Sequence, residues 1–186
     1  MSRIFWPLLP LAFCLAAQAA DNEQIQGQGG RILHYSSTQI RVEPSGEDLR
    51  NYQQARDARL EGASASAALQ AGRKALERLG YKRVDVDADY GVIRAEKDET
   101  LISEARQVLR GLLKLKFPLP GKPDHQTTEV LLTMRPGNQP RQMLLRANIR
   151  QTIWDSNGNS RTLLCTDQTV YRQLFDQLGD ALARPN

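Results

Sequence analysis

The sequence contains few of the residues on which most enzymatic chemistry depends. Its 186 residues include two histidines and two cysteines, and only 6% are aromatic. His34 and His125 lie far apart, and no HExxH or CxxC pair is present to supply metal ligands. A GxSxG motif, which would mark a nucleophilic serine, is also missing. We therefore predict no metal and no cofactor, and the sequence disfavours a serine-type active site.

The scarcity of cysteine bears on both stability and reactivity. Cys14 falls near the start of the chain, so its removal with a leader peptide would leave Cys165 alone and without a disulfide partner. Cys165 lies in the strand-like stretch 161–166, where a free cysteine is typically a small buried apolar residue. Its pairing with His125 is the one thiol-dependent arrangement that the sequence offers. A small periplasmic hydrolase or thiol enzyme is therefore the alternative function.

Long hydrophobic runs are missing as well. The run Ile4–Ala17 has about fourteen residues, whereas a helix needs roughly 20 apolar residues to cross a bilayer. Arg3 precedes the run and small residues follow it, which is the pattern of a secretory signal peptide. We predict that residues 1–20 are this peptide and that it is cleaved near Ala19 or Ala20. The mature protein is then expected in the periplasm, without a transmembrane span.

Cys14 allows a second interpretation of the leader. A lipoprotein leader is cut directly before a lipidated cysteine and places a small residue in front of it. Here the bulky Phe13 occupies that position. Ordinary secretion is thus the preferred prediction, and an outer-membrane lipoprotein with lipidated Cys14 is the alternative.

Charge of one sign is not concentrated anywhere in the chain. Lysine and arginine number 25 and aspartate and glutamate 21, so removal of Arg3 with the leader changes the net charge from +4 to 24 − 21 = +3. Basic and acidic residues alternate along the predicted surfaces instead of forming runs. We therefore expect no nucleic-acid partner. Weak peripheral contact with anionic membrane surfaces remains compatible with this charge.

The hydrophobic pattern divides the chain after the leader into two parts. Residues 21–63 are predicted to be a flexible or partly ordered segment, because residues 21–30 hold almost nothing to bury. A short strand at 31–42 and a polar helix at 49–60 are the elements expected within it. Residues 64–186 carry the regular patterns and are predicted to form a single domain.

Helical and strand patterns alternate along this domain. A helix that begins at Ser64 is expected to end at Gly80, and a β-hairpin follows with its turn at Asp89-Tyr90-Gly91. A second helix with an apolar stripe is expected at 101–112, ended before Pro118. The next elements are strands at 127–134, 142–154 and 161–166, with turns at 135–140 and at Asn157-Gly158, and a last helix capped by Asp167. The expected fold is α+β, an antiparallel sheet with helices packed on one face in the order α-ββ-α-βββ-α.

Polar residues on the later strands form a candidate binding surface. Arg146 and Arg150 share one face of the strand at 142–154, together with an asparagine and a tryptophan. The hairpin that follows is expected to bring an arginine of the next strand beside them. The predicted binding residues are Arg146, Asn148, Arg150, Trp154 and Arg161, and Arg141 belongs to the same basic set. Because sheet faces opposite helices are often exposed, an ordinary solvated face is the alternative interpretation.

Three stretches carry a resemblance to known proteins. They are Ala75-Leu-Glu-Arg-Leu-Gly-Tyr81, Asp89-Tyr-Gly-Val-Ile-Arg-Ala-Glu-Lys97 and Tyr171-Arg-Gln-Leu-Phe-Asp-Gln-Leu178. With them, residues 64–183 resemble a group of small Gram-negative envelope proteins and lipoproteins of largely unassigned role, with a helix-on-sheet domain. A comparable plan occurs in accessory lipoproteins of outer-membrane assembly. The resemblance implies a noncatalytic envelope module and supplies no catalytic residue.

The expected function combines the predicted compartment, the missing catalytic motifs and the candidate surface. We predict a noncatalytic periplasmic binding or accessory protein whose exposed sheet face contacts another envelope component, either a protein or a glycan. The mechanism would be surface complementarity. A third interpretation is a dimer built through sheet edges.

Overall fold

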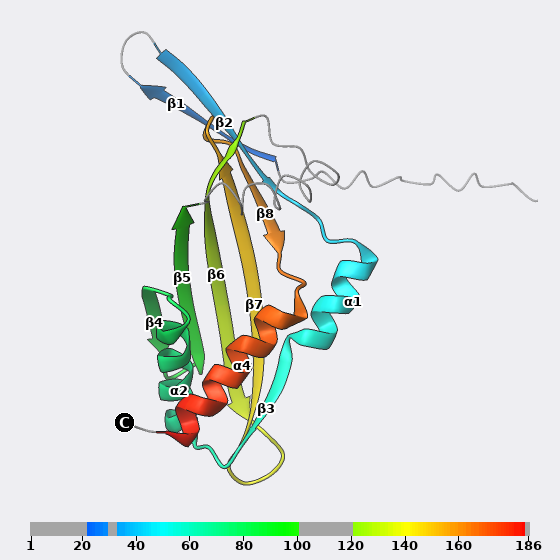
Figure 1. The fold of residues 1–186 in the computed structure, drawn as a ribbon, viewed down its shortest axis with the longest axis vertical. Helices are drawn as coiled ribbons and strands as arrows, with labels where there is room; N and C mark the ends of the chain where they lie inside the picture. Colours follow the sequence, from blue (N-terminus) through cyan, green and yellow to red (C-terminus); the bar gives the residue numbers. More distant parts are fainter. Residues whose placement is uncertain (1–21, 30–32, 101–120, 185–186) are drawn as a thin grey trace, which may run out of the picture.

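The computed structural model describes three stretches of the chain, residues 22–29, 33–100 and 121–184. The predicted signal peptide with Cys14 lies outside the described residues, and so does the helix expected at 101–112. Figure 1 shows how the described elements are arranged.

One sheet of eight strands organises the described chain (Figure 1). Its strands are β1 (Asn22–Gly29), β2 (Leu33–Arg41), β3 (Asp57–Glu61), β4 (Arg83–Asp87), β5 (Val92–Thr100), β6 (Pro123–Pro136), β7 (Gln142–Asp155) and β8 (Ser160–Leu164). Neighbouring strands follow the order β1-β2-β8-β7-β6-β5-β4, and β3 pairs with β7 off this path. Every pair is antiparallel except β2 with β8.

Strand β7 has β6 on one side and two short strands on the other. β8 pairs with residues 150–154 of β7, and β3 pairs with residues 142–146. Between them the backbone of β7 bonds to the flanking loops. The Ala147 N–H donates to the Arg56 carbonyl, and the Cys165 N–H donates to the Ile149 carbonyl, both at 2.9 Å. These bonds satisfy the backbone of β7 where neither short strand reaches it.

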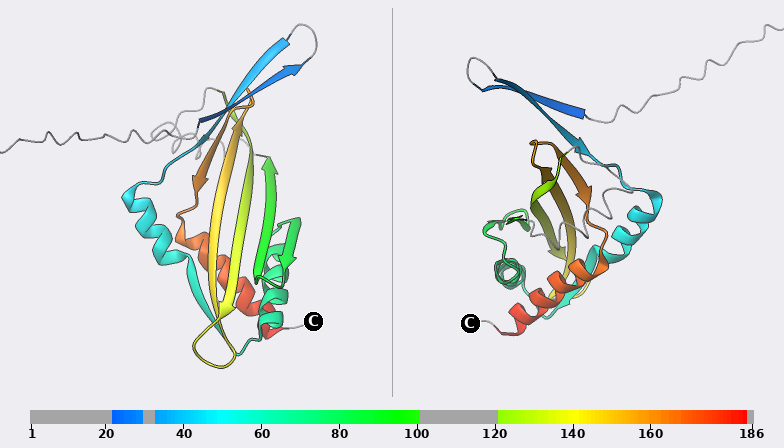
Figure 2. Two further views of the ribbon diagram at one scale, coloured as in Figure 1. Left: turned by 180° about the vertical axis from the view of Figure 1, so that it is seen from behind. Right: turned by 45° about the horizontal axis from the view of Figure 1, so that its top comes forward.

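Three described helices accompany the sheet: α1 (Gly46–Ala55), α2 (Ala65–Arg78) and α4 (Gln168–Ala183). α2 and α4 cross one face of the sheet, whereas α1 lies at its edge near β8 and β3 (Figures 1 and 2). Each helix begins at a side-chain cap, because its first N–H groups have no partner within the helix. The caps are Ser45, Ser64 and Asp167, which accept hydrogen bonds from the N–H groups of Asp48, Ala67 and Thr169. The α+β fold with helices on one face of the sheet is confirmed.

The core lies between the sheet and helices α2 and α4. Alternate residues of β6 and β7 point towards the helices, as their sequence pattern predicts. Leu132 of β6, Leu76 of α2 and Leu178 of α4 are all fully buried there. Gly72 lets α2 approach closely, because a Cβ at this position would stand 2.6 Å from the Cε of Met134.

The predicted turns are made by glycines with positive φ and by an aspartate. Gly91 has φ +64° between β4 and β5, and Gly158 has φ +79° between β7 and β8. The Asp155 carboxylate accepts hydrogen bonds from the N–H groups of Asn157, Asn159 and Gly121 at 2.9, 2.8 and 2.8 Å. Burial raises the pKa of Asp155, but these hydrogen bonds outweigh it and hold the pKa below its usual value.

The N-terminal region is more regular than its composition predicts. Within the segment 21–63, predicted to be flexible or partly ordered, residues 22–29 form β1 and pair with β2 along the whole strand. A β-ladder is held by backbone hydrogen bonds, so a strand with few apolar side chains can still take part in it. The strand expected at 31–42 is confirmed as β2.

The polar helix expected at 49–60 is divided in the structure into α1 and β3. A capping box between Ser45 and Asp48 sets the start of α1. Leu60 is buried where β3 pairs with β7, so the last part of the stretch belongs to the sheet. The described elements from α2 onwards follow the predicted order, but β1-β2-α1-β3 precede them. The predicted order is therefore corrected at its N-terminal end.

Candidate functional site

The face of the sheet that α2 and α4 leave open is the candidate site, and we call it the outer face. Residues that stand opposite one another on paired strands point to the same side of a sheet, so the register identifies the members of this face. They include Asp57 and Arg59 (β3), Arg83 and Asp85 (β4), Arg94 and Glu96 (β5), Glu129, Leu131, Thr133 and Arg135 (β6), and Leu144, Arg146, Asn148, Arg150 and Trp154 (β7). Charged and polar side chains predominate on it.

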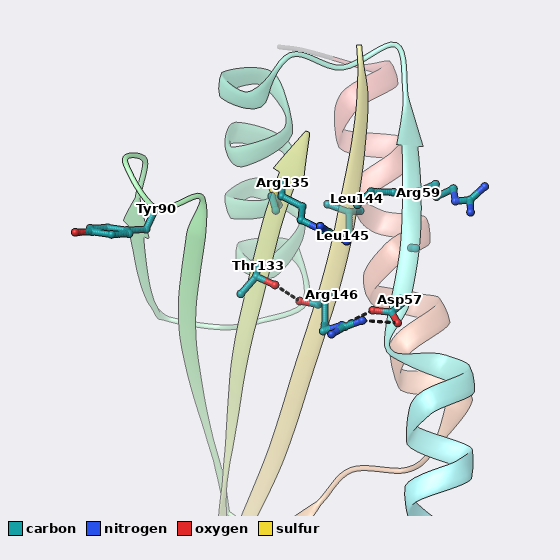
Figure 3. Close-up of a pocket in the computed structure, with 10 residues that line it drawn as sticks. Asp57, Arg59, Tyr90, Thr133, Arg135, Leu144, Leu145 and Arg146 are labelled. Atoms are coloured by element: carbon teal, nitrogen blue, oxygen red, sulfur yellow. Dashed lines mark hydrogen bonds and ion pairs between the residues drawn. The ribbon is translucent and has the colours of Figure 1, made fainter. Parts of the chain in front are cut away.

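Arg146 binds an acidic residue that the sequence did not suggest (Figure 3). Its Nε lies 2.6 Å from Asp57 Oδ1 and its Nη2 lies 3.0 Å from Asp57 Oδ2, so the pair is bidentate. The hydrogen bond from Arg146 lowers the pKa of Asp57 against an opposing effect of burial, and the same contact raises the pKa of Arg146. Both side chains are about half exposed, at 54% and 45%. Arg146 is thus accessible, but Asp57 neutralises its charge.

A hollow of about 520 Å³ surrounds this pair where β3, β6 and β7 run side by side, and we call it the arginine hollow. Figure 3 shows Thr133 and Arg135 of β6 beside Arg146 of β7, with Arg59 extending away from β3. Within the described part of the chain, neither Arg59 nor Arg135 forms an ion pair. Asp57 is the one acid among the described residues that line the hollow, and Arg59, Arg135 and Arg146 give this lining an excess of positive charge.

A second hollow, of about 360 Å³, lies in the middle of the outer face. Arg94 and Arg150 line it together with Glu96 and Glu129, so its charges balance. In the register Arg150 stands directly opposite Glu129. Leu131 is 39% exposed among these charged side chains. This hollow therefore offers an apolar contact, Leu131, surrounded by equal numbers of basic and acidic side chains.

The side-chain amide of Asn148 is partly engaged in a hydrogen bond within the protein. Its Nδ2 donates to the Tyr52 hydroxyl of α1 at 3.1 Å. The buried Tyr52 packs on Tyr171 of α4 with ring centroids 6.2 Å apart, and the Arg56 guanidinium lies 5.1 Å from the Tyr52 ring. Asn148 thus links the outer face to the helices, and its amide serves packing as much as recognition.

Trp154 lies at the other end of β7 from the arginine hollow. Its ring stacks on His125, with centroids 5.7 Å apart and planes at 10°. His125 Nδ1 in turn lies 3.2 Å from Asp124 Oδ2. The two rings form an aromatic patch at this end of the outer face.

Arg161 and Arg141 lie apart from the predicted surface. Arg161 stands opposite Ile153 in the β7–β8 register, and Ile153 is buried on the helix side of the sheet. Because directly opposed residues share a face, the expectation that the hairpin brings Arg161 beside Arg150 is corrected. Arg141 adopts φ +59° in the turn after β6, where its Nη2 donates to the Gly62 carbonyl at 2.8 Å. Its visible role is to tie two turns together.

Sequence reasoning missed Arg135 and Asp57, which with Arg146 define the arginine hollow. The Pro-Gly sequence after Arg135 suggests a turn there, whereas β6 extends to Pro136 and keeps this arginine on the outer face. The alternation of Leu131, Thr133 and Arg135 was the signal that could have placed it. No local signal points to Asp57, because it meets Arg146 across 89 positions of sequence.

The thiol of Cys165 is buried, as predicted. Burial raises its pKa, and a hydrogen bond from the Asp167 backbone offsets that effect only in part. The thiol therefore stays protonated near neutral pH. No contact between Cys165 and His125 occurs among the described residues, and His125 packs on Trp154 instead. This environment is unlike that of an activated cysteine.

Residues 22–29, 33–100 and 121–184 contain no group of three or more histidine, cysteine, aspartate or glutamate side chains placed to hold a metal ion. No helix within these ranges combines the length and the apolar character required to cross a membrane.

No protein-family model matches the chain. No curated protein matches it either. The case for a function therefore rests on the geometry and charge of the outer face.

Proposed function

We propose that this protein is a noncatalytic binding or accessory protein of the bacterial cell envelope, and that its outer face holds an acidic protein partner. The observation that carries the proposal is the arginine hollow, where accessible guanidinium groups outnumber the acids around them. Planar guanidinium groups suit carboxylates because they bind two oxygens at once.

The other outer-face arginines are balanced by acids of the protein itself. Arg83 Nε lies 2.8 Å from Glu96 Oε2, and Arg83 Nη2 lies 3.1 Å from Asp98 Oδ2. Arg150 stands opposite Glu129 on the neighbouring strand. Arg94 likewise stands opposite an aspartate of β4. The unbalanced positive charge is therefore concentrated at Arg59 and Arg135, at one end of the face.

Two exposed apolar side chains make a protein the favoured kind of partner. Leu131 is 39% exposed at the centre of the outer face, and Tyr90 is 81% exposed beside the arginine hollow. Arginine and aromatic residues are enriched at protein interfaces, where apolar contacts supply affinity and charges supply orientation. An acidic glycan would use the arginines but would depend less on Leu131.

Charge reversal in the arginine hollow tests the proposal. We compare capture of envelope proteins by the wild type, by the double variant Arg135→Glu, Arg146→Glu, and by the control Arg73→Glu, Arg78→Glu. The control carries the same change of charge on the exposed side of α2, where Arg73 is also ion-paired, to Glu77. The outer-face variant should recover at least about tenfold less of an acidic partner, and added salt should weaken capture by the wild type.

Equal recovery of the partner by all three proteins would show that the arginine hollow does not take part in binding. An equal loss in both variants would show that net charge alone matters. Circular dichroism must first show that both variants are folded. Digestion of the captured material by glycosidases separates a glycan partner from a protein.

The place of the protein in the envelope is part of the proposal and is supported by the leader-like sequence of residues 1–20. Intact mass of the exported chain tests it. A chain that begins at Ala20 or Asp21 would support a secreted periplasmic protein, and a diacylglyceryl addition on Cys14 would support the lipoprotein alternative. A chain that keeps residues 1–20 unmodified would contradict both.

The thiol-enzyme alternative is tested by alkylation of Cys165. In a noncatalytic protein this buried cysteine should react only after denaturation, because its thiolate is disfavoured. Rapid labelling of the native protein would instead favour the thiol enzyme.

A further inference from the structure

The face of the sheet that carries α2 and α4, which we call the inner face, changes from apolar to polar along the strands. One row across β5, β6 and β7 is Ile93-Leu132-Ala147, and a later row is Lys97-Thr128-Gln151. The first row packs under the helices in the core. The second continues past it with side chains that can form hydrogen bonds.

A pocket of about 190 Å³ lies where these polar rows meet α2 and α4, and we call it the inner pocket. Ile149 of β7 and Leu174 of α4 form part of an apolar wall. The uncharged polar residues that line the pocket, among those described, are Tyr81, Gln126, Thr128, Gln151 and Gln173. Drug-sized ligands occupy about 300 Å³ or more, so this pocket suits a small group and not a whole large molecule.

The polar residues of the inner pocket are buried without all their hydrogen bonds. Tyr81 is 9% exposed and Gln126 is 8% exposed. The Gln126 Nε2 donates to Thr128 Oγ1 at 3.2 Å, but no described residue donates to Gln126 Oε1. The Tyr81 hydroxyl has no hydrogen-bond partner within the described chain. Buried polar groups are normally paired, so two unpaired polar groups on residues that line one pocket point to a ligand that pairs with them.

The protonation state of Tyr81 agrees with a donor role. Burial, with smaller contributions from Cys165 and Glu99, raises the pKa of Tyr81 to about 12. Its hydroxyl therefore keeps its proton at neutral pH.

The charges at the inner pocket cancel. Lys97 Nζ lies 2.7 Å from Glu99 Oε1, and these are the charged side chains that line it among the described residues. A charged ligand would have to separate this pair or remain unpaired. The pocket is thus suited to an uncharged group.

We propose that the inner pocket binds an acetamido group. Its methyl group would pack on Ile149 and Leu174, its carbonyl oxygen would accept from the Tyr81 hydroxyl, and its N–H would donate to Gln126 Oε1. The Tyr81 donor, the Gln126 acceptor and the apolar wall correspond to the three parts of this group. The site is separate from the outer face, so it does not depend on the function proposed there. Acetamido chemistry occurs in N-acetylated sugars and in acetylated peptides.

Titration of the full chain with two probes distinguishes these sources. The probes are N-acetyl-D-glucosamine and N-acetyl-L-alanine methylamide, and D-glucose is the control without an acetamido group. Methyl resonances of Ile149 and Leu174 should shift saturably, with dissociation constants on the order of 1–10 mM for a group this small. Saturation by the sugar alone identifies a glycan source, by the peptide alone an acetylated peptide, and by both the shared group.

Tyr81→Phe removes the hydroxyl and keeps the ring. It should weaken binding of the probe by about tenfold or more, because a buried hydrogen-bond partner is lost. Without ligand, the melting temperature should stay unchanged or rise, since the hydroxyl has no hydrogen-bond partner to lose among the described residues. The matched control is Tyr171→Phe, which should lower the melting temperature because the Tyr171 hydroxyl donates to the Cys165 carbonyl at 2.9 Å.

Three results would overturn the proposal. The first is no saturable shift with either probe up to about 100 mM. The second is an equal shift with D-glucose. The third is undiminished binding by Tyr81→Phe, or a melting temperature lowered as far as in Tyr171→Phe, which would reveal a protein partner for the Tyr81 hydroxyl.

Discussion

The inner and outer faces of the sheet are built on the same strands but differ in what they contribute. Leu132 and Leu131 are neighbours in β6, yet the first is fully buried and the second is 39% exposed, because successive strand residues point to opposite sides. The inner face under α2 and α4 holds the buried core, and burial of apolar side chains is the dominant favourable contribution to folding. The exposed side chains of the outer face contribute little to this core. Its arginines and hollows can therefore contact a partner without loss of core packing.

The largest effect expected is loss of the inner-face leucine. Leu132→Ala should lower the free energy of unfolding by about 2–5 kcal/mol, because it leaves a cavity beneath the helices. Leu131→Ala, one residue away, should change it by less than about 1 kcal/mol. Urea denaturation of the two variants measures the difference. Similar decreases in the free energy of unfolding at both positions would show that the two faces contribute equally to stability.

The turn at Gly91 tests a stability effect that belongs to neither face. Gly91 has φ +64°, and a Cβ there would collide with the Met134 carbonyl oxygen. Gly91→Ala should therefore cost about 2–3 kcal/mol, from backbone strain together with the collision. Gly62 also has positive φ (+74°) but has open space around it, so Gly62→Ala should cost only about 1 kcal/mol. Equal losses in the two variants, measured by urea denaturation, would show that the collision is relieved at no cost.

Substitution of Asp155 tests whether one buried polar side chain can contribute as much to the free energy of unfolding as a buried apolar one. It is 4% exposed and organises the β7–β8 turn. Asp155→Asn should lower the free energy of unfolding by about 1–3 kcal/mol at pH 7, because the charged acceptor of several N–H groups is lost.

The effect of Asp155 should also depend on pH. Its folded pKa is lowered below the unfolded value of about 3.9, so its contribution is fully present above that value and is lost as pH falls through the folded pKa. The gap in stability between wild type and Asp155→Asn should therefore narrow as pH falls below about 4. A gap that stays constant to lower pH would contradict the lowered pKa.

The smallest effect on stability is expected at the Asp57–Arg146 pair. Both side chains are exposed, so Asp57→Asn should leave the urea midpoint nearly unchanged. The same variant should increase capture of an acidic partner by about twofold or more, because the Arg146 charge is no longer neutralised. Reduced capture would indicate that Asp57 positions Arg146 for binding instead of competing with the partner.

The local sequence pattern predicts much of this fold. The pairing between segments distant in the sequence could not be predicted from it. Alternation identified the buried face of β6 and β7, and the glycines at 91 and 158 identified the hairpins. No local pattern shows that β3 would pair with β7, so the partner of Arg146 stayed hidden. Arg161 was misplaced because one position of register moves a side chain to the other face.

Site-specific photocrosslinking shows whether a partner binds at the outer face. A photoreactive residue is placed at Leu131 on the outer face or at Gln70, which is exposed on α2. After irradiation of cells that express the full chain, we expect a discrete adduct from position 131 and none from position 70. An adduct from position 70 and none from position 131 would contradict this expectation.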